Sequence, residues 1–125
     1  LNTYNQVDIS LDPFPYGGGI TTLESLCMGT PVVSLTDDSK IAHRNSSAIL
    51  SPLGLNEWVA KTKDEYVEIA CHWANNLEEL LDIRRELRGR VLTQTAKFVP
   101  QIEIAYREMW RRWCRGEESS PLYIK

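Results

Sequence analysis

Three consecutive glycines, Gly17, Gly18 and Gly19, stand directly before a segment of helical periodicity that begins at Ile20. Glycines remove side chains where a backbone must bend and approach a ligand closely. The helix that follows would turn the free N–H groups of its first turn, and the positive end of its dipole, toward the loop. Such an arrangement favours an anion as the ligand.

Polar side chains early in this helix add to the pattern. Thr21 and Thr22 offer two hydroxyl donors, so a diphosphate can be held without a basic side chain or a metal. Glu24 lies one turn further along and can accept hydrogen bonds from two ribose hydroxyls, as an acidic residue does in dinucleotide folds. The alternative is an ordinary loop with a solvated Glu24, since the motif is neither GxGxxG nor a P-loop.

The elements that must position these residues form a βαβ pattern. Residues 7–11 alternate between apolar and polar side chains, which predicts a strand. Residues 20–28 have helical spacing and end at Gly29, and residues 31–35 form a valine-rich run typical of a buried strand. The order of these elements implies parallel pairing with a right-handed crossover.

The rest of the chain is predicted to be mostly helical. Thr62, followed by Glu65 three residues later, forms a capping box that begins a helix. The other expected elements are a helix over 41–50, a turn over 51–54, a short helical stretch over 55–60, and helices over 77–96 and 101–115. Four tryptophans fall among aliphatic residues in helical patterns and are expected in the core: Trp58, Trp73, Trp110 and Trp113.

Composition narrows the function classes. The chain has 125 residues, of which 42% are hydrophobic and 25% charged, as in a globular protein. Its net charge of −3 gives no general attraction to nucleic acid or anionic lipid, and it has no apolar run of bilayer length. Three widely spaced cysteines favour reduced, buried thiols in the cytosol. Because the chain begins at Leu1 without a signal peptide, we expect a piece of a longer protein.

Charged residues after the second strand offer weaker candidates. Arg44 can face a cleft, or it can form a surface ion pair with Asp37 or Asp38. His43 has no carboxylate at a fixed spacing and is not expected to act as a base. The two aspartates are expected to cap the next helix rather than bind a metal, since the sequence has neither a DxD pair nor a histidine cluster.

The run Leu11–Val33 resembles the nucleotide-sugar-binding segment of GT-B glycosyltransferases, with its glycine loop, acidic helix residue and closing Gly-Thr-Pro-Val-Val strand. The Asp-Pro-Phe-Pro-Tyr-Gly-Gly opening is similar to the O-linked N-acetylglucosamine transferase family, which includes SPINDLY and bacterial tetratricopeptide proteins. The resemblance implies an α/β fold: the C-terminal part of a Rossmann-like GT-B nucleotide-sugar-binding domain, with a short parallel sheet followed by C-terminal helices. Residues 1–97 would belong to the donor-binding domain, and residues 98–125 would form a closing helix and tail of the same unit.

The resemblance also implies an activity: inverting, metal-independent transfer of a sugar from a nucleotide diphosphate to Ser or Thr hydroxyls of proteins. It implies no cofactor, with UDP-N-acetylglucosamine as the expected donor substrate. Protein acceptors would bind to regions upstream, in the cytoplasm or the nucleus, with neither nucleic acid nor membrane as a partner. Without those upstream regions the chain alone would be inactive. The resemblance implies no catalytic residue and no metal ligand in this chain, and it makes Arg44 a further candidate for the cleft. The implied donor-binding residues are Gly17, Gly18, Gly19, Ile20, Thr21, Thr22 and Glu24.

The loop departs from the animal members of that family. They carry a histidine and two threonines where this chain has Gly19, Ile20 and Thr21, whereas the plant-like form matches Thr22 and Glu24 in register. The donor therefore stays open between the N-acetylglucosamine and fucose branches. A non-catalytic GT-B-like remnant that serves as a binding or scaffold module is the alternative from another class.

Overall fold

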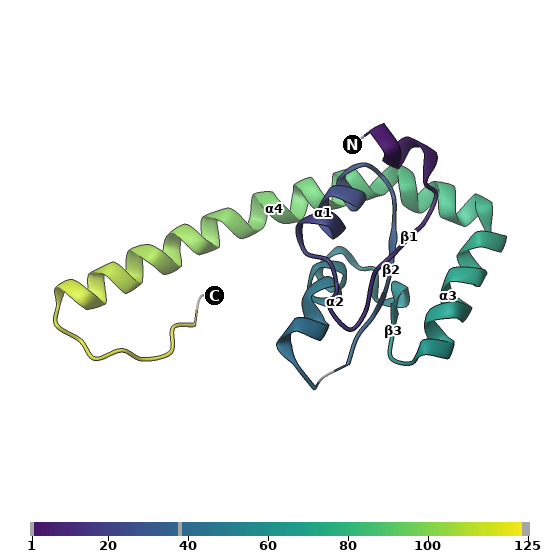
Figure 1. The fold of residues 1–125 in the computed structure, drawn as a ribbon. Coiled ribbons are helices and arrows are strands. Elements are labelled where there is room, and N and C mark those ends of the chain that lie inside the picture. The colour runs from purple at the N-terminus through teal and green to yellow at the C-terminus, as the bar shows by residue number, and fades with distance from the viewer. Residues whose placement is uncertain (1, 38, 124–125) are drawn as a thin grey trace. The chain divides into compact units, whose positions relative to one another are not determined.

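The computed structural model describes residues 2–37 and 39–123 (Figure 1). The chain divides into two compact units, Leu1–Val91 and Leu92–Lys125, and each is described by itself. The elements in chain order are the 3-10 helix η1 (Asn2–Gln6), β1 (Ser10–Leu11), α1 (Ile20–Cys27), β2 (Val32–Leu35), the 3-10 helix η2 (Ile41–Arg44), α2 (Asn45–Leu50), the 3-10 helices η3 (Ser51–Leu53) and η4 (Asn56–Trp58), β3 (Val59–Ala60), α3 (Lys63–Asn75) and α4 (Leu77–Cys114).

A short parallel sheet in the order β1-β2-β3 forms the centre of the first unit. Ser10 lies opposite Val32, and Ser34 lies opposite Val59. The loops that leave the carboxyl ends of β1 and β2 therefore lie at the same edge of the sheet. Helices lie on both sides of the strands in Figure 1, so the predicted α/β class with a short parallel sheet is confirmed.

The core of this unit joins the sheet to the helices around it. Val33 on β2, Leu26 on α1 and Leu50 on α2 are fully buried. Each buried leucine contributes about 1.5–3 kcal/mol relative to an exposed one. Trp58 stacks on Trp73 with the ring centroids 4.5 Å apart, which fixes α3 against the segment before β3.

The ends of two helices follow the sequence signals. After α1 the chain passes through Gly29, whose φ of 79° favours glycine. At the start of α3 the Thr62 hydroxyl accepts a hydrogen bond from the Glu65 N–H at 3.1 Å, and the Glu65 carboxylate accepts one from Lys61 N–H at 2.7 Å. The predicted Thr62 cap is thus confirmed and sets where α3 begins, while Glu65 bonds to the N–H one residue before Thr62 instead of to that of Thr62 itself.

Two secondary-structure expectations were wrong. The stretch 55–60 is not a helix, because after one 3-10 turn the residues of β3 pair with Ser34 and Leu35. A strand of two residues is too short to show an alternating pattern. The expected break between 96 and 101 is also absent, since α4 contains Pro100. A proline removes one backbone donor from a helix and its ring crowds the carbonyl four residues earlier, yet α4 continues through Pro100.

Residues 92–123 expose more apolar surface than the sequence suggested. Trp110 and Trp113 are 65% and 75% exposed and were wrongly placed in the core, unlike Trp58 and Trp73. The helical spacing of these apolar residues predicts that they share one face of α4, but it does not predict whether that face is buried. Among the cysteines, which are all free, Cys27 is half-buried but Cys71 and Cys114 are exposed, against the expectation of buried thiols. No helix within the described residues is both long and apolar enough to cross a membrane.

Candidate functional site

The first turn of α1 opens onto the glycine loop. The first hydrogen bond of the helix runs from Leu23 N–H to the Gly19 carbonyl at 3.1 Å. The N–H groups of Ile20, Thr21 and Thr22 come before this bond, so they are the donors that a helix N-terminus presents to a ligand. The positive end of the helix dipole lies at the same place, and no acidic residue occupies the first turn.

The three glycines have different surroundings. A Cβ atom on Gly17 would lie 2.8 Å from Asp12 Oδ2, and one on Gly18 would lie 2.5 Å from Thr22 Oγ1. A Cβ atom on Gly19 would have no atom of the protein within 4 Å. The fold itself therefore requires the first two glycines, whereas space beside Gly19 is open to a ligand.

Asp12 is a residue of this site that the sequence reasoning missed. Its side chain is buried, with 5% of the residue exposed. One carboxylate oxygen accepts a hydrogen bond from Gly18 N–H at 2.8 Å, and the other accepts one from the Ser34 hydroxyl at 3.0 Å. Its position directly after a strand and before the prolines and glycines of the loop was the available signal.

Ser46 on α2 is a second residue that was missed. It is 1% exposed, and its hydroxyl donates to the Gly18 carbonyl at 2.9 Å. The same hydroxyl lies 3.2 Å from the hydroxyl of Thr22, which is itself buried. Thr22 therefore joins α1 to α2, and its hydroxyl is already bonded within the protein. Nothing in the local sequence pairs Ser46 with a loop so far away along the chain.

The loop is also held from α3. The Tyr66 hydroxyl donates to the main-chain carbonyl of Asp12 at 2.9 Å, and the Tyr66 ring meets Phe14 edge-on at 5.5 Å. Burial, and to a lesser degree the negative charge of Asp12, raise the pKa of Tyr66 above its ordinary value. The phenol is thus kept protonated and able to donate.

The structure brings most of the predicted site residues together. Gly17–Thr22 form the loop and the first turn of α1, and Glu24 is exposed one turn further along. Ile20 is 76% exposed. Thr21 and Thr22 line a pocket of about 200 Å³ together with Asp12 and residues of β1. Arg44 does not join them: it is exposed and lines another pocket, of about 490 Å³, beside Asn45 and Val59.

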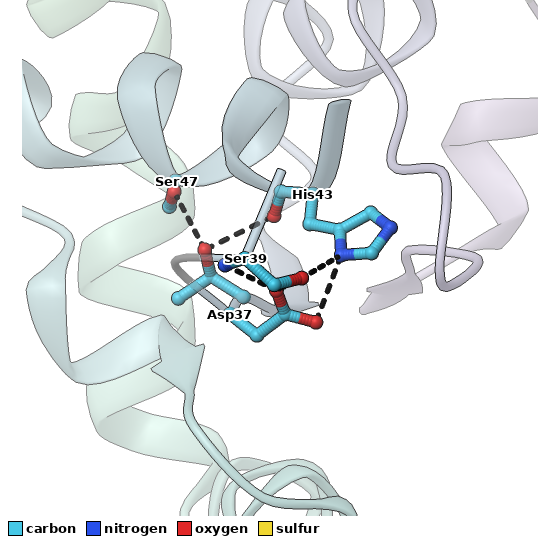
Figure 2. Close-up of polar contacts among 5 residues, drawn as sticks. Asp37, Ser39, His43 and Ser47 are labelled. Atoms are coloured by element: carbon cyan, nitrogen blue, oxygen red, sulfur yellow. Dashed lines mark hydrogen bonds and ion pairs between the residues drawn. The ribbon is translucent and has the colours of Figure 1, made fainter. Parts of the chain in front are cut away.

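The loop after β2 has its own polar cluster, shown in Figure 2. Asp37 accepts hydrogen bonds from the N–H and hydroxyl of Ser39, and its Oδ2 lies 2.8 Å from Nδ1 of His43. The Ser39 and then the His43 hydrogen bonds lower the pKa of Asp37 to about 2. His43 therefore has a carboxylate partner, which the sequence reasoning had denied it, and Asp37 pairs with His43 rather than Arg44. Asp37 does not cap η2, and Asp38 lies outside the described residues.

The sequence and fold of this chain are similar to those of known proteins. The family model described as glycosyl transferase family 41 matches residues 4–100. The chain belongs to glycosyl transferase family 41. Within family 41, the chain is 43% identical over 124 residues to a tomato (Solanum lycopersicum) protein named probable UDP-N-acetylglucosamine–peptide N-acetylglucosaminyltransferase SPINDLY. It is 40% identical over 124 residues to the Arabidopsis thaliana protein of the same name.

A solved structure of a Thermobaculum terrenum O-GlcNAc transferase mutant is similar in fold, with a TM-score of 0.80 and 39% sequence identity. The match covers 92% of this chain and 23% of that one. The two plant matches each cover 96% of this chain, but only 13% of the tomato protein and 14% of the Arabidopsis protein. Membership of the SPINDLY and O-GlcNAc transferase-like family 41 is thus confirmed for a chain that spans about an eighth of those plant relatives.

Proposed function

We propose that this segment binds the diphosphate and ribose of a nucleotide-sugar donor in a glycosyltransferase that modifies Ser or Thr hydroxyls of proteins. The observation that carries the proposal is the open space beside Gly19 at the N-terminus of α1. A helix N-terminus that follows a close-approach glycine suits a phosphate group. The name of the tomato relative gives UDP-N-acetylglucosamine as donor and a peptide as acceptor, which supports this choice of substrates.

Within this proposal four of the predicted residues, Gly19, Ile20, Thr21 and Glu24, act on the donor directly. Gly19 admits a phosphate oxygen to the N–H groups of Ile20 and Thr21, and these donors stabilise the charge that develops on the leaving diphosphate. Thr21 is exposed and adds a hydroxyl donor. Glu24, also exposed, accepts from the ribose hydroxyls.

The rest of the proposed reaction depends on regions outside this chain. A basic side chain at the diphosphate, the groups around the base and the acceptor site belong to those regions, so the chain by itself is inactive. The transfer inverts the anomeric centre, needs neither a metal nor a cofactor, and takes place in the cytoplasm or nucleus.

The test uses the full-length protein and calorimetric titration with UDP and GDP, followed by a transfer assay with UDP-N-acetylglucosamine and acceptor peptides. We expect UDP to bind and sugar to be transferred. Preference for GDP would move the donor to the fucose branch. Binding of either nucleotide without any transfer would favour the non-catalytic module, and binding of neither would contradict the proposal.

A further inference from the structure

We propose that Asp12 and Ser46 are positioning residues, which together fix the direction of the Gly19 N–H group toward the donor diphosphate. The inference rests on the proposed function of the loop and adds two residues that touch no donor atom. Neither residue is one of the three glycines, and they come from different parts of the fold, the position directly after β1 and helix α2.

Gly18 is held at both of its peptide groups. Its N–H donates to Asp12 Oδ1 at 2.8 Å, and its carbonyl accepts from Ser46 Oγ at 2.9 Å. Two neighbouring peptide planes on either side of one glycine are therefore tied to different parts of the fold. Glycine is the residue with the most backbone freedom, so these two bonds remove motion where the chain would otherwise have most of it.

The second of these bonds determines where Gly19 N–H points. The Gly18 carbonyl and the Gly19 N–H belong to the same peptide unit, which is planar and trans, so they point in opposite directions. Because Ser46 draws the carbonyl toward α2, the N–H is turned away from α2. This N–H belongs to the glycine whose Cβ position has no protein atom within 4 Å, and it adds one donor to those of the first turn of α1.

Burial shows that the two side chains act through the loop. Ser46 is 1% exposed and Asp12 is 5% exposed, and both carboxylate oxygens of Asp12 already accept hydrogen bonds within the protein. Asp12 is further held by the hydroxyl of Ser34 on β2 at 3.0 Å. The loop geometry is thus set by β1, β2 and α2 before a donor arrives, which lowers the ordering cost of binding.

The first test compares Ser46→Ala with Ser47→Ala in the full-length protein. Both change a serine of α2, but the Ser47 hydroxyl bonds to Thr36 and to the Arg44 carbonyl instead of the loop. We expect Ser46→Ala to weaken UDP or GDP binding and to raise the donor KM by about tenfold, the size of one lost hydrogen bond. The kcat should change less than the KM, and Ser47→Ala should match the wild type.

A merely structural role for Ser46 would give a different result: less folded protein, a lower kcat and an unchanged donor KM.

The second test is a conservative rescue at Asp12. In Asp12→Asn the amide oxygen can still accept from Gly18 N–H, while its NH₂ group donates to Ser34, whose hydroxyl can also accept. We expect Asp12→Asn to bind UDP or GDP within about threefold of wild type, and Asp12→Ala to lose at least about tenfold.

The outcomes separate this inference from the proposed function. If the wild type binds nucleotide and Ser46→Ala binds as tightly as Ser47→Ala, the positioning role is wrong while donor binding stands. Equal loss in Asp12→Asn and Asp12→Ala would overturn the hydrogen-bonding role of Asp12. If the wild type binds neither UDP nor GDP, the proposed function fails and this inference fails with it.

Discussion

The loops that follow β1 and β2 leave the same edge of the sheet but are held in place differently. The glycine loop after β1 is fixed by two buried side chains, Asp12 at its own start and Ser46 on α2, and by the half-buried Tyr66 on α3. The loop after β2 is tied to α2 at its start, where the Thr36 hydroxyl lies 3.2 Å from that of Ser47. Beyond Thr36 it is held by exposed contacts between near neighbours in sequence, Asp37 with Ser39 and His43. Buried hydrogen bonds to a loop are costly to break, whereas exposed ones exchange readily with water.

This difference indicates which loop can do preorganised chemistry. A loop whose backbone is held from three sides presents its N–H groups in a fixed direction to a ligand. A loop held by short-range surface contacts can change one partner without disturbing the core. Substitutions in the first loop should therefore affect binding or folding strongly, and those in the second should have small effects.

The largest expected effect comes from Gly19. Gly19→Val in the full-length protein should weaken nucleotide binding at least a hundredfold, because its side chain fills the open space that we assign to a phosphate oxygen. Gly19→Ala should lose about tenfold. Gly19→Ala should not lower the unfolding temperature, since the protein has no atom within 4 Å of that Cβ position. Calorimetric titration and thermal unfolding measure both effects, and tight binding by Gly19→Val would refute the assignment.

Gly17 should show the opposite pattern. A Cβ atom there would lie 2.8 Å from Asp12 Oδ2 and 3.0 Å from Ser46 Oγ, and both groups are held by other bonds. Gly17→Ala should therefore destabilise the fold by about 1–3 kcal/mol, in the range of overpacked sites. Denaturant unfolding, with Gly19→Ala as the control, is the measurement. Equal stability of the two variants would mean that the loop is looser than the structure shows.

Glu24 should have an intermediate effect, and only on ligands that contain ribose. Glu24→Gln removes a charged acceptor and should weaken UDP or GDP binding by about 1–2 kcal/mol, roughly tenfold. Inorganic pyrophosphate, which has no ribose, should bind equally well to both proteins. An equal loss for both ligands would show that Glu24 acts through the anion site instead.

Local patterns in the sequence predicted what depends on local physics. The glycine loop, the start of α1 and the Thr62 cap follow from residue types at short spacing, and all lie where expected. Family resemblance added what these patterns alone could not establish, the glycosyltransferase family. The β3 strand was missed because two residues carry no periodic signal.

The support for the loop could not be predicted in the same way. Ser46 lies 28 positions after Gly18, and only the folding of α2 against α1 brings the two together. The Asp37–His43 pair spans six positions, and no helical or strand spacing relates the two residues. Contacts of this kind depend on tertiary packing, which a single sequence does not display.

Asp37 should show a small dependence of stability on pH. Its pKa in the folded protein, about 2, is below the ordinary 3.8, so its contribution is present above pH 3.8 and is lost as the pH falls through about 2. Asp37→Asn should thus be slightly less stable than wild type near neutral pH, and this difference should shrink below pH 4. A thermal-unfolding series of both proteins tests this, and a difference that grows in acid would contradict it.

The smallest expected effect is that of a chelator, which should not change turnover. This experiment tests which of the two loops binds the diphosphate. If a metal were required, the adjacent aspartates Asp37 and Asp38 are the pair of carboxylates that the sequence offers for it. The Asp37 carboxylate, however, already accepts from Ser39 and His43, and a cation would have to displace both. The glycine loop offers N–H donors and a helix dipole instead, which oppose the same negative charge without a metal.

Excess EDTA should therefore leave sugar transfer by the full-length protein unchanged, and Asp37→Asn should not alter this result. The matched comparison is Gly19→Val, which should abolish transfer with or without Mg²⁺. Loss of turnover that Mg²⁺ or Mn²⁺ restores would show that a cation shares the diphosphate charge. If Asp37→Asn then also lost activity, the second loop would take the role that the buried contacts of Asp12 and Ser46 now assign to the first.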